Sequence, residues 1–293
     1  MTIRACPYCG KSGNLHFTVY SRRYNRCTAC DLIYRQTLES YGDVVAKYRE
    51  GYFDRYSGDQ LAGQRARLYE HILDLITGNQ GAGRLLDVGT GCGFFLVAAQ
   101  KRQWEVKGVE PSLQSVEMAR RQHGLDVFAG SLQEYGENSQ FDAITFINVL
   151  EHSIWPWQEI DRAQELLRPG GLIYLRFPNG FLHSRINRLV NKDPLANWLR
   201  RFLVFHQYSF TTRYIRRLLQ NSGFVQATIH NSPLSEGDPH QLFPHASFAT
   251  YVKRLIYLIA EGTQIITFGQ LFLGPSLEVT AIKPHSPNTQ HQA

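Results

Sequence analysis

Apolar residues follow two alternating periods along the middle of the chain. Short apolar-rich runs, typical of buried strands, begin at Arg84 and cover residues 105–110, 126–129, 141–147 and 171–178. Between these runs apolar side chains return every three or four positions, which predicts helices over residues 94–102, 112–123 and 157–167. Because strands and helices alternate, we expect an α/β fold with a mostly parallel sheet and helices on both of its faces.

The same periodicity predicts further elements on either side of this core. A helix is expected over residues 60–76, after an aromatic and charged segment over residues 41–57. Another helix follows Thr211 and is stopped by Gly223, and residues 224–230 then form a strand. These elements would extend the sheet beyond its central strands.

The first central strand runs directly into a glycine-rich turn. Asp87 ends the strand, and Gly89, Gly91 and Gly93 follow at alternate positions before a helix starts at Phe94. Glycines let the backbone turn sharply and approach a ligand, and such a turn at the start of a helix is typical of nucleotide sites. Phe94 stands where the dinucleotide motif has its third glycine, and the Asp87 carboxylate would repel a pyrophosphate but suit a ligand with an ammonium group.

S-adenosylmethionine is a ligand of this kind, and the stretch from Leu85 to Gly93 resembles motif I of the class I S-adenosylmethionine-dependent methyltransferases. Two further stretches, residues 148–152 and 166–171, resemble later family motifs in the expected order. The core resembles the ubiquinone-type O-methyltransferases, and the general layout resembles sugar methyltransferases with cysteine-rich N-termini. The resemblance implies a Rossmann-like sheet of seven strands, closed by an antiparallel strand for which residues 276–283 are the candidate.

Residues at the ends of the strands are candidates for contact with this cofactor. Glu110 ends the second central strand, where a carboxylate can accept hydrogen bonds from both ribose hydroxyls; alternatively it caps the helix that begins after Pro111. Ser131 stands where family members usually carry Asp in the adenine-contacting motif. Together with the resemblance, these positions assign cofactor binding to Asp87, Gly89, Thr90, Gly91, Gly93, Glu110, Ser131, Leu132 and Asn148.

Four of the five cysteines form two C-x-x-C pairs near the N-terminus. The pairs are Cys6 with Cys9 and Cys27 with Cys30, a spacing expected of a structural zinc site with four thiolates. A redox dithiol would explain one such pair but not two. The residues between the pairs can form a hairpin that closes the tetrahedron, so residues 1–40 are expected to be a zinc ribbon that needs its metal to fold.

The domain organisation follows from these elements. We expect a zinc ribbon over residues 1–40, a linker and helix that cover the cofactor over residues 41–83, and a methyltransferase domain over residues 84–283. That domain would carry insertions at 179–209 and 231–274, and residues 284–293 read as a disordered polar tail.

Composition and charge restrict the partners only loosely. The net charge of +6 permits an acidic partner such as nucleic acid or an anionic membrane, but surplus arginine is more often a solvated face. There is no apolar signal segment and no run of about 18 uncharged apolar residues, so a cytoplasmic protein is expected.

The second insertion carries an apolar helical pattern over residues 248–273. It would pack on the domain or on a second subunit in a homodimer, or it would lie on a membrane surface as a peripheral contact. Only Lys253 and Arg254 make that helix basic, which favours a protein contact.

The functional hypothesis is a methyltransferase that acts on a small or carrier-linked metabolite, with O-, N- and C-methylation left open. The alternative enzyme is an RNA methyltransferase, because some ribosomal RNA methyltransferases resemble this plan of zinc module plus class I domain. In that case Arg22, Arg23, Arg26 and Arg35 of the ribbon would contact phosphates. A non-catalytic interaction protein is the third reading, and the intact glycine loop argues against it.

Two histidines are candidates for a general base. His152 follows the end of the strand that bears Asn148, at the rim where a parallel sheet of this type places its ligand. His206 lies just before the helix at Thr211, in the segment expected to cover the acceptor. Alternatively, alignment of the acceptor alone suffices, or another group such as Tyr208 removes the proton.

Overall fold

The computed structural model describes residues 5–19, 21–37, 64–78, 81–136, 140–191, 205–236 and 246–285, and the single residues Glu39, Ala46 and Leu203. The segment expected over residues 41–57 and most of the predicted C-terminal tail lie outside these ranges.

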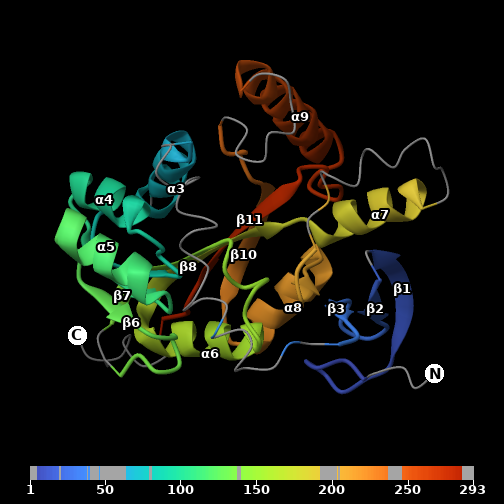
Figure 1. Cartoon of the computed structure of the whole chain (residues 1–293), viewed down its shortest axis with the longest axis horizontal. Helices are drawn as coiled ribbons and strands as arrows, with labels where there is room; N and C mark the ends of the chain where they lie inside the picture. Colours follow the sequence, from blue (N-terminus) through green and yellow to red (C-terminus); the bar gives the residue numbers. More distant parts are fainter. Residues whose placement is uncertain are drawn as a thin grey trace, which may run out of the picture.

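A large twisted sheet forms the centre of the molecule (Figure 1). It has seven strands in the order β10-β11-β8-β7-β4-β5-β6. The strands are β4 (Arg84–Val88), β5 (Glu105–Glu110), β6 (Val127–Ala129), β7 (Phe141–Ile147), β8 (Leu167–Pro178), β10 (Val225–Asn231) and β11 (Ser276–Ile282). Pairing is parallel from β8 to β6, and β11 runs antiparallel to β8 and β10. The predicted Rossmann-like sheet, with its antiparallel strand, is confirmed.

Helices cover both faces of this sheet. They are α3 (Ala66–Thr77), α4 (Phe94–Lys101) and α5 (Leu113–His123) on one face, and α6 (Pro156–Leu166) and α8 (Thr212–Asn221) on the other. Neighbouring residues of β4 show the division, because Leu85 packs with the first group of helices and Leu86 with the second. Apolar residues on both sides of each central strand therefore have a helix to pack against, as the continuous apolar runs predict.

A second, smaller sheet contains the cysteine-rich segment. Its strands β1 (Gly13–Val19), β2 (Arg22–Cys27) and β3 (Ile33–Arg35) form the predicted hairpin and one additional strand. The sheet continues with β9 (Tyr208–Ser209), which pairs with β3 although it belongs to the insertion before α8. This pairing fixes the ribbon to the large domain at a position that the sequence pattern did not indicate.

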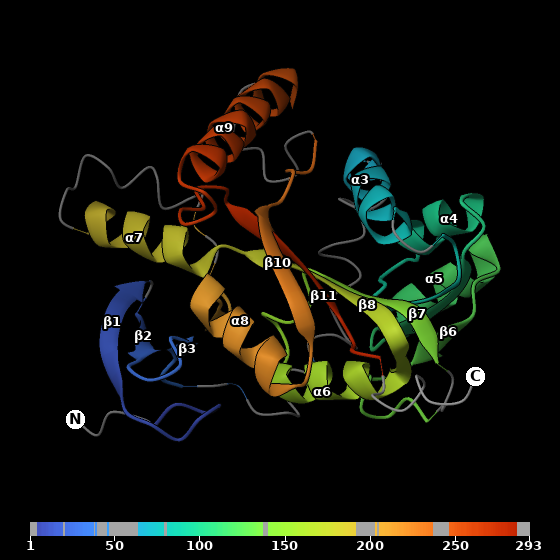
Figure 2. The same ribbon diagram turned by 180° about the vertical axis from the view of Figure 1, so that it is seen from behind.

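Two further helices lie in the insertions. Helix α7 (Gly180–Val190) follows β8 and packs on the ribbon, where the Asn191 side chain donates a hydrogen bond to the Thr18 carbonyl at 3.2 Å. Helix α9 (Ala246–Ile266) confirms the helical pattern expected there, and it projects from the sheet at the end opposite α6 (Figures 1 and 2). Among the residues described, no helix combines the length and apolar character needed to cross a membrane.

Candidate functional site

The glycine loop between β4 and α4 has a backbone that only glycine adopts easily. Gly89, Gly91 and Gly93 have φ angles of 70°, 56° and 82°, in the left-handed region. A Cβ atom on Gly89 would lie 2.5 Å from the Val149 side chain, and one on Gly93 would lie 2.3 Å from that of Leu125. The loop is therefore closely packed at Gly89 and Gly93, and Gly89 also borders a cavity.

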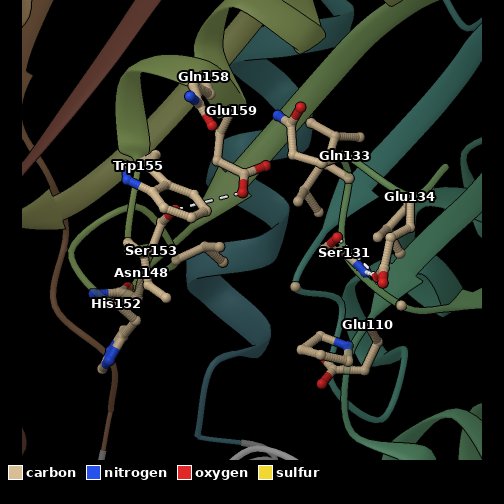
Figure 3. Close-up of a pocket in the computed structure, with 18 residues that line it drawn as sticks. Glu110, Ser131, Gln133, Glu134, Asn148, His152, Ser153, Trp155, Gln158 and Glu159 are labelled. Carbon is tan, nitrogen blue, oxygen red and sulfur yellow. Dashed lines mark hydrogen bonds between the residues drawn. The ribbon is translucent and has the colours of Figure 1, made fainter. Parts of the chain in front are cut away.

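This cavity lies at the carboxyl ends of β4, β5, β6 and β7 and has a volume of about 350 Å³. Figure 3 shows Glu110, Ser131 and Glu134 on one side and Asn148, His152 and Trp155 on the other. Of the residues predicted to bind the cofactor, Gly89, Glu110, Ser131, Leu132 and Asn148 line it. The strand ends thus bring together side chains that the sequence placed on four separate strands.

Glu110 is a buried carboxylate that is held by backbone N–H groups. Its Oε2 accepts a hydrogen bond from Gly91 N–H and its Oε1 accepts one from Ser112 N–H, both at 2.8 Å. Burial raises the pKa of Glu110 to about 7, and the charge of nearby Asp87 raises it further. The two backbone hydrogen bonds act in the opposite direction, because they stabilise the ionised carboxylate. An ionised carboxylate has about four acceptor positions, so two remain for a ligand in the cavity.

Asp87 lies beneath the loop and is not among the residues that line the cavity. It is buried, and the Thr145 hydroxyl donates a hydrogen bond to its Oδ1 at 2.6 Å. Burial raises the pKa of Asp87 to about 7. Thr90 is also buried in this loop, and its N–H donates to the Val109 carbonyl at 3.2 Å. These two residues can shape the loop and its electrostatic potential without reaching into the cavity.

Two acidic residues that line the cavity, Glu134 and Glu159, were not indicated by the sequence motifs. Ser131 donates from its backbone N–H and from its hydroxyl to Glu134 Oε2, at 2.8 Å and 2.9 Å. Glu159 of α6 is buried, and burial raises its pKa to about 7. The spacing of Glu134 three residues after Ser131 is a sequence signal for such a local bond, whereas nothing in the sequence pointed Glu159 toward the cavity.

Asn148 begins the loop after β7 in a left-handed conformation, with a φ angle of 60°. Its side-chain amide donates to Glu151 Oε1 at 3.3 Å, and its Oδ1 accepts from Arg176 of β8. The second Glu151 oxygen, Oε2, is buried without a hydrogen-bond partner among the described residues, and burial raises the pKa of Glu151 to about 7. This leaves an acceptor position available next to the cavity rim.

The two candidate bases lie against each other at this rim. The rings of His152 and His206 have centroids 4.0 Å apart, and burial lowers the pKa of His152 to about 4 and that of His206 well below its ordinary value. Ligand atoms of Glu151, His152 and His206 lie within 4.8 Å of one another. Two neutral imidazoles and a carboxylate can accept a proton or bind a divalent cation, so the predicted pair forms one polar cluster.

The ribbon holds the backbone that carries His206. The Tyr24 hydroxyl donates to the His206 carbonyl at 3.0 Å, and Arg35 N–H donates to the Gln207 carbonyl at 2.9 Å. Next along the chain, the Tyr208 hydroxyl donates to the carbonyl of Ile154, which lines the cavity. The ribbon therefore builds part of the wall around the histidine pair.

The four paired cysteines gather at one point of the ribbon. The Sγ atoms of Cys6 and Cys30 are 3.6 Å apart and those of Cys9 and Cys27 are 3.5 Å apart. All four lie within 4.8 Å of one another. Tetrahedral zinc with bonds of about 2.3 Å separates its sulfur ligands by about 3.8 Å, so the cluster has the dimensions of a zinc site.

Fold and site together define the class of Rossmann-like methyltransferases. A family model described as "Methyltransferase domain" matches residues 61–228, more than half of the chain. The chain therefore belongs to this methyltransferase family.

Curated relatives and solved structures resemble parts of the chain. The ubiquinone biosynthesis O-methyltransferase of Ruegeria pomeroyi is 31% identical over 155 residues, covering 50% of this chain and 59% of that protein. The enzyme of the same name from a Chelativorans strain is 28% identical, covering 48% and 58%. The chain thus spans 58–59% of the length of these relatives. The structure of Burkholderia thailandensis 1,6-didemethyltoxoflavin-N1-methyltransferase aligns with a TM-score of 0.53 at 15% identity, over 92% of this chain and 99% of that one, which shows the fold alone.

Proposed function

We propose that the chain is an S-adenosylmethionine-dependent methyltransferase that transfers a methyl group to an oxygen atom of a small or carrier-linked metabolite. The observation that carries this proposal is the cavity of about 350 Å³, where the glycine loop, Glu110 and Asn148 meet at the ends of adjacent strands. The names of the curated relatives favour an oxygen acceptor.

Each cofactor contact has a residue suited to it. The loop from Gly89 to Gly93 would hold the methionine part, with the buried Asp87 beneath it favouring the positive charge of its ammonium group. Glu110 would accept the ribose hydroxyls with the lone pairs that its two backbone bonds leave over. Ser131 and Leu132 would border the adenine, and Glu134 fixes Ser131 in place.

The chemistry divides between the cofactor and this chain's residues. S-adenosylmethionine supplies a methyl group that is already electrophilic on its sulfonium. The protein has to align the acceptor and to accept its proton. His152 lines the cavity and touches His206, and both imidazoles are neutral because burial disfavours the cation. A proton taken up by this pair would be stabilised by the neighbouring carboxylate of Glu151.

The ribbon supports a small-molecule acceptor more than RNA. Arg26 is bound to both oxygens of Asp31, at 2.6 Å and 2.9 Å, and Arg35 forms an ion pair with Glu39 at 3.3 Å. Two of the four arginines that would contact phosphates are therefore already paired with acids. We propose that the four cysteines bind one structural zinc and that the ribbon's role is to hold the wall of the acceptor site.

Calorimetry with S-adenosylmethionine tests the cofactor site. Changing Glu110 to Ala should weaken binding by on the order of 2 to 3 kcal/mol, since a charged acceptor of two hydroxyls is lost. Glu105→Ala is the matched control, because Glu105 lies on the same strand, is exposed and pairs only with Arg84. Unchanged affinity in Glu110→Ala would mean that Glu110 only supports the loop and helix, and no binding to the wild-type protein would contradict the proposed function.

A further inference from the structure

A buried guanidinium lies beside the cofactor cavity at the end of β8. Arg176 is 7% exposed, and each of its three nitrogens donates to an uncharged acceptor. Nε donates to Ser232 Oγ at 2.8 Å, Nη2 donates to the Pro233 carbonyl at 3.1 Å, and Nη1 donates to Asn148 Oδ1. No carboxylate lies within ion-pair distance of it in the parts of the chain that the structure describes.

The nearest acids are committed elsewhere. Glu278 lies opposite Arg176 in the pairing of β11 with β8, but its oxygens accept hydrogen bonds from Tyr174 and His71, both at 2.9 Å. The hydrogen bond with Glu278 raises the pKa of His71. Glu151 accepts a hydrogen bond from the Asn148 amide at 3.3 Å and makes no ion pair with Arg176. Arg176 is thus a buried charge that has no carboxylate in direct contact among the described residues.

Burying the charge of a guanidinium destabilises the fold unless an anion binds to it. Removing a cation from water without a paired anion costs several kcal/mol. Three of the five guanidinium N–H groups of Arg176 are used, so two remain to bind an oxyanion. A carboxylate or phosphate is the chemistry that a guanidinium recognises best.

Arg176 lines neither of two nearby cavities itself, but a hydrogen-bond partner of its side chain borders each of them. Asn148 lines the cofactor cavity, and Pro233 lines a second cavity of about 140 Å³. That second cavity lies between α3 and α9, which occupy the same side of the sheet in both views (Figures 1 and 2). Its lining includes three cations, Arg67, Lys253 and Arg254, and one acid, Glu236.

The charges of this second cavity do not cancel. Arg67 and Arg254 share the Glu236 carboxylate at 3.0 Å and 3.3 Å, and Lys253 donates to the Ser235 carbonyl at 3.2 Å. Among the described residues that line this cavity, Arg67 and Arg254 therefore share a single carboxylate. The potential on this side of Arg176 favours the approach of an anion.

We propose that Arg176 binds an oxyanion of the methyl acceptor, which makes the acceptor a carboxylated or phosphorylated small molecule. The inference rests on the proposed function, because it assigns the substrate class of the same site. Asn148 then lies between the cofactor and the methyl acceptor, since it lines the cofactor cavity and accepts a hydrogen bond from Arg176. The remaining N–H groups of Arg176 orient the acceptor, and no covalent step involves this residue.

The test uses small probes on the full-length protein saturated with S-adenosylhomocysteine. Benzoate and inorganic phosphate represent the two oxyanions, and benzamide is the neutral match of benzoate. Calorimetry should show that one of the anions binds about tenfold or more tightly than benzamide. Arg176→Met should abolish this preference and Arg176→Lys should keep part of it. Arg120→Met is the control, because among the described residues that guanidinium donates to the Val127 carbonyl alone and lies away from Asn148.

The outcomes separate this inference from the cofactor assignment. If wild-type protein binds S-adenosylhomocysteine but does not distinguish either anion from benzamide, the oxyanion site is wrong and the cofactor site stands. Preference for an anion that survives in Arg176→Met also contradicts it. Should Arg176→Met fail to fold, Ser232→Ala replaces it in the test, because this change removes one hydrogen bond of Arg176 and retains the charge. The preference for an anion must then persist in Ser232→Ala and be weaker in Arg176→Lys. If S-adenosylhomocysteine itself does not bind, the proposed function fails first.

Discussion

The cofactor cavity and the segment that carries His206 border each other, but they draw on different parts of the chain. The loop, Glu110, Ser131 and Asn148 follow one another along the sequence, each at the end of the next strand. His206 is held by Tyr24, 182 positions away in the chain, and its neighbours continue the ribbon's sheet. One region is assembled by local strand order and the other by contacts between segments that are far apart in the sequence.

This difference predicts different sensitivities. The cofactor cavity should depend on its own loop residues and tolerate damage to the ribbon. The histidine segment should depend on the ribbon even where the cofactor still binds.

Loss of zinc should have the largest effect on turnover, and it should disturb the histidine segment but not the cofactor cavity. Cys27→Ser removes one of four thiolates, and structural zinc provides much of the folding free energy of such small modules. We expect zinc content to fall from about one per chain, the stoichiometry of a four-ligand site, and turnover to fall by about a hundredfold or more. Metal analysis reports on the cysteine site and calorimetry with S-adenosylmethionine reports on the cofactor cavity, and both can be done on one preparation.

Thr28→Ala is the control for that experiment, because Thr28 lies inside the second C-x-x-C pair and its exposed hydroxyl donates to the Ser12 carbonyl. It should retain zinc. If cofactor affinity falls together with zinc in Cys27→Ser, the two regions are one cooperative unit and the separation is wrong. A fully folded, zinc-free ribbon would contradict the metal site.

Replacement of the paired histidines tests the chemical role of the second region. If His152 or His206 is the general base, its change to Ala should lower turnover by roughly a hundredfold while cofactor affinity stays near the wild-type value. If the residue only shapes the pocket, the Michaelis constant of the acceptor should rise instead. Steady-state kinetics with an acceptor that supports turnover distinguish the two, and His16→Ala on the ribbon is a matched histidine control. Unaltered turnover in both variants would leave alignment as the source of catalysis.

The sequence predicted the central fold well because its signals are local. A buried strand such as Phe141–Ile147 needs only apolar residues in a row, and the glycine loop needs φ angles that glycine alone adopts without strain. Glu110 was predicted to bind a ribose or to cap a helix. The structure shows that it accepts a hydrogen bond from Ser112 N–H, and this bond is compatible with either role. Its cofactor role stays a prediction.

The remaining features depend on contacts that no local pattern contains. β9 is only two residues long, and it forms because β3 offers an open edge. Arg176 appeared in the sequence as one charged residue in an apolar strand, and its burial follows from the loop after β10 that folds over it. Asp87 was predicted to bind the cofactor, which stays a prediction, and the hydrogen bond of its side chain with Thr145 of β7 was not indicated by the sequence.

The pH dependence of cofactor binding provides a smaller test on the first region. Burial raises the pKa of Glu110 and of Asp87 to about 7 in the protein without ligand. Ionised carboxylates favour the cationic ligand and its hydroxyls, so affinity for S-adenosylmethionine should fall about tenfold as the pH decreases from 7 to 6. The free energy of unfolding of the ligand-free protein should change with pH in the opposite direction. A carboxyl group with a raised pKa contributes stability at low pH, and this contribution is lost as the pH rises through about 7.

Calorimetry across this range, in buffers of different ionisation enthalpy, should detect protons released on binding. Glu110→Gln should flatten the profile. A pH-independent affinity would show that both carboxylates are already ionised in the free protein.

The smallest effect is expected from a single hydroxyl between the two regions. Tyr24→Phe removes the hydrogen bond to the His206 carbonyl at 3.0 Å and leaves the buried ring in place. One neutral hydrogen bond contributes about 1 kcal/mol, so turnover should fall about fivefold with zinc content and cofactor affinity unchanged. Tyr8→Phe is the matched control, because its hydroxyl accepts from Asn221 of α8 and lies on the same ribbon without touching His206. If both variants slow turnover equally, the ribbon acts through its overall attachment to the domain and not through the backbone of His206. If neither does, the β3–β9 pairing alone is enough to hold the histidine pair.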